Sequence, residues 1–114
     1  MVRIEQDINW FANEDKEIEF TIVDTDGEAV DVSGATVIVW VCVRLRSIQE
    51  NLIVKELASG ITVATNVVTV TLTPTDTDQL SGKYRHELRM TDDSLETVLV
   101  TGEVEVYKSL TKDL

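Results

Sequence analysis

The sequence predicts an all-β protein, an immunoglobulin-like antiparallel β-sandwich of about seven strands. Short segments in which polar and apolar residues alternate recur along the 114 residues, and turn residues separate them. No segment has the apolar spacing of an amphipathic helix longer than one turn. Tyr84 begins a strand after a corner that contains Leu80 and Gly82, an arrangement typical of the tyrosine corner in immunoglobulin-like sandwiches.

The first third of the chain contains short candidate strands. A strand over 2–8 alternates only briefly, which suits the edge of a sheet. Trp10 and Phe11 follow it and are expected to fold back over one end of the core. In residues 17–22, polar and apolar side chains alternate, which predicts a strand with one face in water that ends at an Asp-Gly turn. Residues 30–32 are expected to form a short extended piece.

Residues 36–45 form the most hydrophobic candidate strand, and both of its faces are apolar. Valines occupy one face without interruption, whereas Ile38, Trp40 and Cys42 occupy the other. Because the valine face is unbroken, we expect it to face the core. The alternative is the immunoglobulin arrangement, in which the tryptophan of this strand faces inward.

The alternation continues in the second half of the chain. Residues 52–57 suit an edge strand, and residues 61–63 and 68–72 form two more short strands. Pro74 cannot continue a ladder, because it has no backbone N–H. The strand over 83–90 alternates most clearly. One face carries Tyr84, His86, Leu88 and Met90, and the other carries Lys83, Arg85, Glu87 and Arg89.

A turn and a long last strand complete a single domain over residues 1–114. Asp76 and Asp78 are expected to cap the turn before the tyrosine corner, in preference to binding a metal. The last strand runs over 98–106, with a bulge expected at Gly102. Residues 108–114 are expected to form a flexible tail.

Composition limits the classes of partner. The net charge is −11 at pH 7, which disfavours nucleic acid and anionic membrane surfaces. Cys42 is the one cysteine, so an intrachain disulfide is impossible. The first ten residues lack the continuous apolar core of a secretory signal, and the apolar run over 37–43 is too short for a spanning helix. We therefore expect a protein that is made in the cytosol.

Few residues are candidates for chemistry. Asp24, Asp26 and Glu28 surround a glycine and form a weak cation-site candidate, although a plain hairpin turn is preferred because the calcium-loop spacing is incomplete. His86, the single histidine, is expected to be a hydrogen-bonded core residue, and Cys42 an inert buried thiol. We expect no enzyme activity, no metal and no cofactor.

The remaining candidate is a surface for protein partners. If the valines face the core, Ile38, Trp40 and Cys42 project outward and form an interface patch, unless a neighbouring segment covers them. The segment with Val2 and Ile4 is a candidate for pairing with the open edge of a neighbour. The substitution Trp40→Asp is then expected to weaken assembly while the monomer stays folded.

The layout resembles a family of small immunoglobulin-like domains in phage structural proteins, notably the N-terminal domain of siphophage baseplate upper proteins. The resemblance extends over about residues 16–106, and it rests on ordered sequence stretches: Thr21-Ile22-Val23-Asp24-Thr25-Asp26-Gly27-Glu28, Val30-Asp31-Val32-Ser33-Gly34-Ala35-Thr36-Val37, Gly60-Ile61-Thr62, the strand over 68–72, Leu72-Thr73-Pro74 with Asp76-Thr77, Leu80-Ser81-Gly82-Lys83-Tyr84 and Thr101-Gly102-Glu103-Val104-Glu105-Val106. It implies a virion component, assembled in the host cytoplasm, that binds other phage structural proteins or itself and has no active site. Tail, baseplate, neck and capsid decoration all fit this role.

Two other functions stay open at the level of sequence. One is a surface-displayed adhesin or carbohydrate-binding β-sandwich, although an aromatic content of 5% leaves few rings to stack on sugars. The other is a small acidic inhibitor or assembly factor, since an acidic surface can complement a basic partner.

Overall fold

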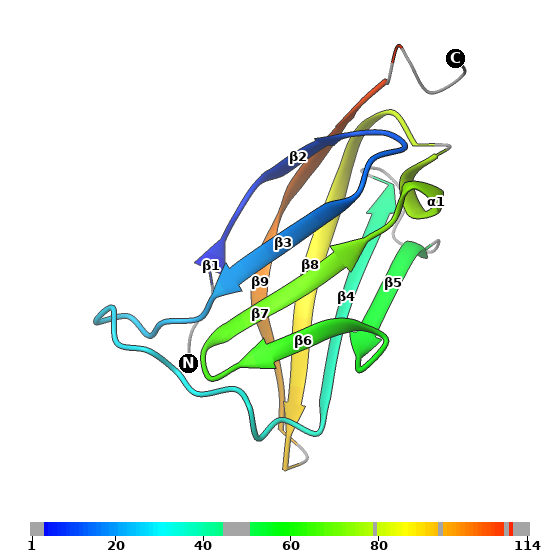
Figure 1. Ribbon diagram of the computed structural model, residues 1–114. Coiled ribbons are helices and arrows are strands. Elements are labelled where there is room, and N and C mark those ends of the chain that lie inside the picture. The colour runs from blue at the N-terminus through cyan, green and yellow to red at the C-terminus, as the bar shows by residue number, and fades with distance from the viewer. Residues whose placement is uncertain (1–3, 45–50, 79, 94, 109, 111–114) are drawn as a thin grey trace.

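The computed structural model describes residues 4–44, 51–78, 80–93, 95–108 and 110. Within these residues the protein is all-β, as the sequence predicts, with nine strands and one helical turn (Figure 1). The strands in chain order are β1 (Ile4–Glu5), β2 (Ile8–Phe11), β3 (Lys16–Thr21), β4 (Val37–Arg44), β5 (Asn51–Leu57), β6 (Gly60–Ala64), β7 (Val67–Leu72), β8 (Gly82–Asp92) and β9 (Leu95–Tyr107). The helical turn α1 is Pro74–Thr77.

The strands follow one hydrogen-bonded path that curls into a half-barrel (Figure 1). The order is β1-β9-β8-β4-β5-β6-β7-β3, and β2 also pairs with β9. Neighbouring strands are antiparallel except where β1 and β2 run parallel to β9 and where β5 meets β6. The β5–β6 contact, at Glu56–Gly60 and Leu57–Ile61, joins what would otherwise be two separate sheets.

The concave side of the curl holds the hydrophobic core. Alternation in β3, β7 and β8 places one face of each strand inside, as expected from the sequence. The largest fully buried side chains come from seven different strands and one loop: Trp10, Trp40, Phe20, Ile22, Ile38, Ile61, Leu72, Leu88, Leu99, Val68, Val70 and Val100.

The expected orientation of β4 is wrong. Ile38, Trp40 and Cys42 are buried, and the valines lie on the convex side. Burying the large indole inside the curl removes more apolar surface from water than burying a valine would, and the indole N–H finds a buried partner there. The three residues are therefore not an exposed interface patch, and Trp40→Asp is now expected to unfold the domain.

The N-terminal segment also differs from expectation. The predicted strand is interrupted at Gln6 and Asp7, so β1 and β2 are separate short strands along β9. Trp10 enters the core, whereas Phe11 stays exposed and packs against Tyr107 with ring centroids 5.3 Å apart. Ile4 is partly buried against the core.

Some predictions fall on residues outside the described ranges. These are Val2, the last residue of the predicted strand over 36–45, most of a polar loop expected over 47–51, and residues 109 and 111–114 of the predicted tail.

The tyrosine corner is formed by hydrogen bonds within one turn. The Tyr84 hydroxyl donates to the Ser81 carbonyl at 2.8 Å and accepts the Ser81 N–H at 2.9 Å. Gly82 has φ +98°, a conformation that side chains disfavour, and Leu80 packs against the core from the same turn. These contacts fix where β8 begins.

The bulge in β9 lies at Leu99 and not at Gly102. The register moves from Leu88–Val100 to Arg89–Val98, so Leu99 is the extra residue, and it is buried beside Val100. Gly102 pairs regularly with His86, but it is needed for another reason. A Cβ at Gly102 would stand 2.8 Å from Nε2 of His86 and closer still to the carbonyl oxygen of Gln6.

We therefore expect Gly102→Ala to lower the free energy of unfolding by about 2–3 kcal/mol, because the added methyl forces β1–β2 and β8 apart. Urea denaturation measures the loss. The matched control is Gly34→Ala, where an added Cβ meets nothing within 4 Å, so stability should hardly change. Equal stabilities of the two variants would show that the close approach at Gly102 is unimportant.

Candidate functional site

His86 lies at the centre of a buried polar chain that crosses the core. The indole N–H of Trp40 donates to Nδ1 of His86 at 3.1 Å, and Nε2 of His86 contacts the carbonyl oxygen of Gln6 at 2.6 Å. Since the indole can only donate and the carbonyl can only accept, His86 is neutral with its proton on Nε2. The expectation that His86 is a hydrogen-bonded core residue is confirmed.

The surroundings of His86 keep the ring uncharged. Burial lowers the pKa of His86, and this effect outweighs the hydrogen bond to Gln6 and the nearby negative charge of Asp7, which act in the opposite direction. The ring also stacks on Phe20, with centroids 5.7 Å apart. Both ring nitrogens are engaged, so His86 joins strands in this conformation and has no nitrogen available to a substrate.

Cys42 is a buried thiol opposite His86 in the β4–β8 register. Burial raises the pKa of Cys42 to about 12, so the thiol stays protonated at neutral pH. The protonated thiol packs as a small apolar group, in agreement with the inert role expected from the sequence.

The conformation of the acidic loop after β3 is stabilised by hydrogen bonds within the loop. One carboxylate oxygen of Asp24 accepts the N–H groups of Asp26 at 2.9 Å and Glu28 at 3.0 Å. Gly27 takes φ +83° and its N–H donates to the Asp24 carbonyl, which gives the expected hairpin turn. In the described part of the chain, no three acidic, histidine or cysteine side chains gather as a metal site.

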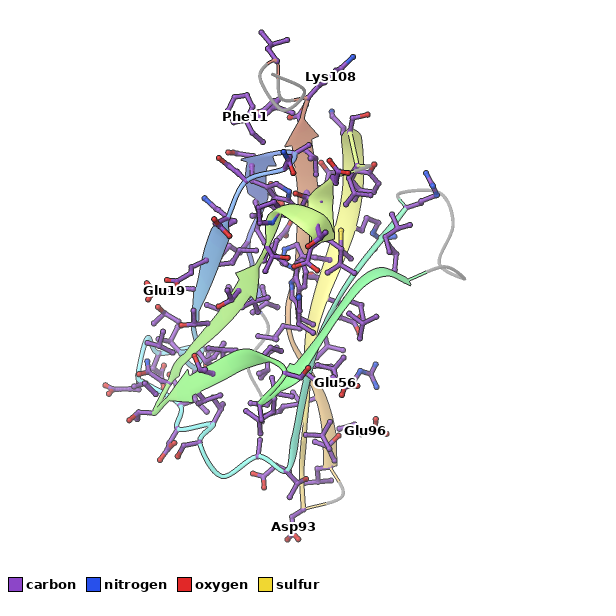
Figure 2. All side chains as sticks on the ribbon, turned by 45° about the vertical axis from the view of Figure 1, so that its right-hand side comes forward. Phe11, Glu19, Glu56, Asp93, Glu96 and Lys108 are labelled. Carbon is purple, nitrogen blue, oxygen red and sulfur yellow. The ribbon has the colours of Figure 1, made fainter. Side chains whose placement is uncertain are left out.

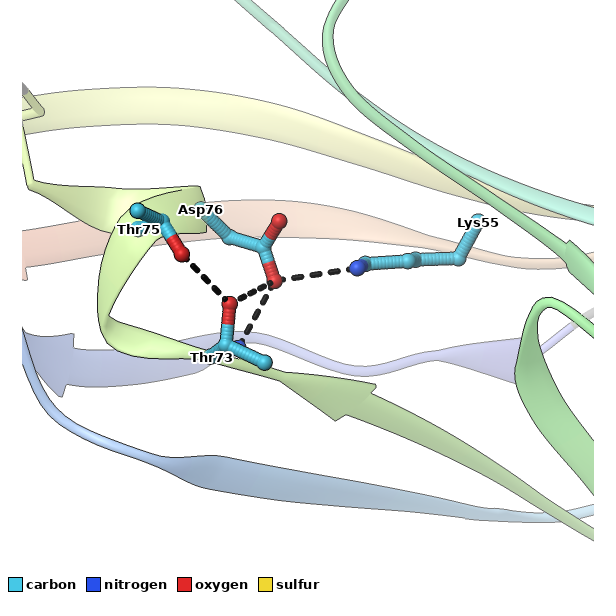
Figure 3. A network of polar contacts seen from close by, with 4 residues as sticks. All are labelled: Lys55, Thr73, Thr75 and Asp76. Atoms are coloured by element: carbon cyan, nitrogen blue, oxygen red, sulfur yellow. Dashed lines mark hydrogen bonds and ion pairs between the residues drawn. The ribbon is translucent and has the colours of Figure 1, made fainter.

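Asp76 stabilises the turn between β7 and β8, as predicted (Figure 3). Its carboxylate accepts the Thr73 N–H at 2.7 Å and forms an ion pair with Lys55 of β5 at 2.9 Å. Burial would raise the pKa of Asp76, but the contacts with Thr73 and Lys55 outweigh it and the pKa is lowered. The ion pair ties α1 to β5.

The convex side of β4 and β5 carries an unusual row of apolar side chains, which we call the valine stripe. The members are Val37, Val39, Val41, Val43 and Val54. Val37 and Val54 are each 46% exposed, and the other three are partly exposed. By contrast, β3 carries Glu17, Glu19 and Thr21 at its exposed positions, which is the usual pattern for a sheet face in water.

Paired charges frame the valine stripe on the β8 side. Charged residues of β8 stand opposite three valines of β4. In the β4–β8 register the pairs are Arg85 with Val43, Glu87 with Val41 and Arg89 with Val39. Arg89 also contacts Glu87 at 3.5 Å and Glu96 at 3.3 Å. Glu96 of β9 lies on this side, whereas Glu56 of β5 lies on the other side of β4 (Figure 2). Exposed ion pairs of this kind contribute little to stability.

Sequence reasoning also missed the gap between β2 and β3, two neighbouring strands that do not pair with each other, which we call the seam. Gln6 bridges it, since its side-chain amide donates to the Glu19 carbonyl at 3.2 Å. Gln6 occupies a position of the N-terminal alternation where the neighbouring members are isoleucines. A polar residue at an inward position is the signal that could have identified it.

Comparison with protein-family models and with curated proteins finds no match. No helix in the described ranges is long and apolar enough to cross a membrane.

His86 should make stability depend on pH. Its pKa is lowered in the folded state from an ordinary value of 6.5, so the unfolded chain takes up a proton first. Above pH 6.5, His86 therefore does not reduce the free energy of unfolding. Below pH 6.5, the free energy of unfolding falls by up to about 1.4 kcal/mol per pH unit.

Urea denaturation between pH 7.5 and about 5 measures this slope. His86→Gln offers an amide in place of the ring and cannot titrate, so the slope below pH 6.5 should be smaller in that variant. Identical slopes in the two proteins would assign the pH dependence to carboxylates instead.

Proposed function

We propose that this chain is a non-enzymatic structural subunit of a phage particle, assembled in the host cytoplasm, that acts through protein–protein contacts. The resemblance to domains of phage structural proteins supports the phage setting. The valine stripe supports the mode of action, since it is an apolar surface on a chain of net charge −11.

We also propose that the half-barrel is a variant of the immunoglobulin-like sandwich. Three features support this assignment. An N-terminal strand, β2, runs parallel to the last strand. Trp40 points inward from a central strand, and Tyr84 hydrogen-bonds to the backbone of the corner before β8.

The observation that carries the functional proposal is the composition of the convex face of β4. Valine stands at each outward position from 37 to 43, although these positions are exposed or partly exposed and could hold polar residues. β-Branched residues favour strands, but the exposed positions of β3 satisfy the same geometry with glutamate and threonine. An apolar row with a charged frame is therefore typical of a protein-binding face.

Quantitative mass spectrometry of purified phage particles tests the setting. We expect this chain at a fixed ratio to the major capsid and tail-tube proteins. A ratio near one would indicate capsid or tube decoration, and a much lower fixed ratio would indicate a neck or baseplate position. If the chain is missing from particles and stays free in the lysate, the structural role is wrong.

A paired substitution tests the surface. Val41→Arg with Val54→Arg places two charges on the valine stripe and should abolish incorporation into particles while circular dichroism shows a folded domain. The control, Thr25→Arg with Ala29→Arg, adds the same charges at two exposed positions of the loop after β3, away from β4 and β5, and should be incorporated normally. Normal incorporation of the valine variant would contradict the proposed binding face.

A further inference from the structure

Two strand edges face each other across the seam of the half-barrel. The hydrogen-bonded path ends at β3, and β2 pairs with β9 alone. The two strands lie side by side and run in opposite directions (Figure 1), and both contribute to one groove. Among the described residues, no backbone hydrogen bond joins β2 to β3.

On the β3 side, backbone groups of alternate residues point into the seam. The Glu19 carbonyl accepts the Gln6 side chain there, whereas the Ile22 N–H donates to Asn66 beyond β7. Residues of a strand direct their N–H and C=O groups alternately to one neighbour and the other. Glu17, Glu19 and Thr21 therefore present their backbone to the seam.

The same argument applies to β2. The Ala12 N–H donates to Tyr107 of β9, so the even-numbered residues face β9. The Phe11 N–H points the other way and donates to the Glu14 carboxylate at 2.9 Å. Asn9 consequently directs its N–H and C=O into the seam, opposite those of β3.

Apolar and acidic side chains line the seam at different depths. Ile8 and Ile18 are buried beneath it, whereas Glu17 and Glu19 are exposed at its rim. The groove is lined by Gln6, Asp7, Ile8, Asn9, Lys16, Glu17, Ile18 and Glu19. Three carboxylates against one ammonium give the lining a charge of +1 − 3 = −2.

We propose that the seam between β2 and β3 accepts an extended segment of a partner protein as an additional strand, and that this segment alternates apolar residues with lysine or arginine. Its backbone replaces the bond that the Gln6 side chain makes to Glu19. Its apolar side chains face Ile8 and Ile18, and its basic side chains face the glutamates. The inference rests on the proposed function and adds a second contact site, distinct from the valine stripe.

The probe is a short capped peptide in which lysine and valine alternate, titrated into ¹⁵N-labelled protein. We expect amide shifts at Asn9, Glu17, Glu19 and Thr21. A peptide with glutamate in place of lysine is the matched control and should bind at least about tenfold more weakly. Shifts on the valine stripe alone, or no shifts with either peptide, would overturn the proposal.

Two variants separate the backbone contribution from the charge contribution. Glu17→Lys with Glu19→Lys keeps the backbone and should reverse the preference, so that the glutamate peptide binds more tightly. Glu17→Pro removes a seam-facing N–H that β7 does not use and should weaken binding of both peptides. An unchanged preference in the charge-reversed variant would contradict the stated partner chemistry, even if the proline variant fails to fold.

Two further controls separate this site from its alternatives. The Val41→Arg, Val54→Arg variant should still bind the lysine peptide, so loss of particle incorporation and loss of peptide binding are independent results. If the same seam amides shift with protein concentration and no peptide, the occupant is a second copy of the chain and the proposed partner is wrong.

Discussion

The chain of hydrogen bonds from Trp40 through His86 to Gln6 holds the curled sheet together across its core. It links β4, β8 and the break between β1 and β2, which are distant in sequence. A buried indole N–H or carbonyl without a partner would each cost about 1–3 kcal/mol, and one ring removes both costs here, whereas the buried indole N–H of Trp10 has no hydrogen-bond partner among the described residues. Gly102 permits the approach by leaving room for the Gln6 carbonyl.

This arrangement determines which parts of the molecule are free to act. Trp40 and Cys42 are fully buried, so the concave side of β4 has no surface to offer a partner. The available features are the convex valine stripe and the seam, and each leaves something unsatisfied: apolar area in one case and backbone hydrogen-bonding groups in the other. Both features suit the proposed role in protein–protein contacts.

Local patterns in the sequence predicted much of the fold. Alternation located β3, β7 and β8, and the corner before Tyr84 located the start of β8. The orientation of β4 could not be read from alternation, because both of its faces are apolar and period two does not distinguish them. The inward orientation gives the Trp40 N–H a buried acceptor in His86, which stands diagonally across from Trp40, one pair along from Leu88 on the same face, only once β4 and β8 are in register.

The state of the His86 ring tests the account most directly. Nitrogen chemical shifts of a ¹⁵N-histidine-labelled protein report which ring nitrogen is protonated. We predict a neutral ring at pH 7 with the proton on Nε2 and a bare, hydrogen-bonded Nδ1. A proton on Nδ1, or a positively charged ring at that pH, would contradict the Trp40–His86–Gln6 chain and the closure of the sheet that depends on it.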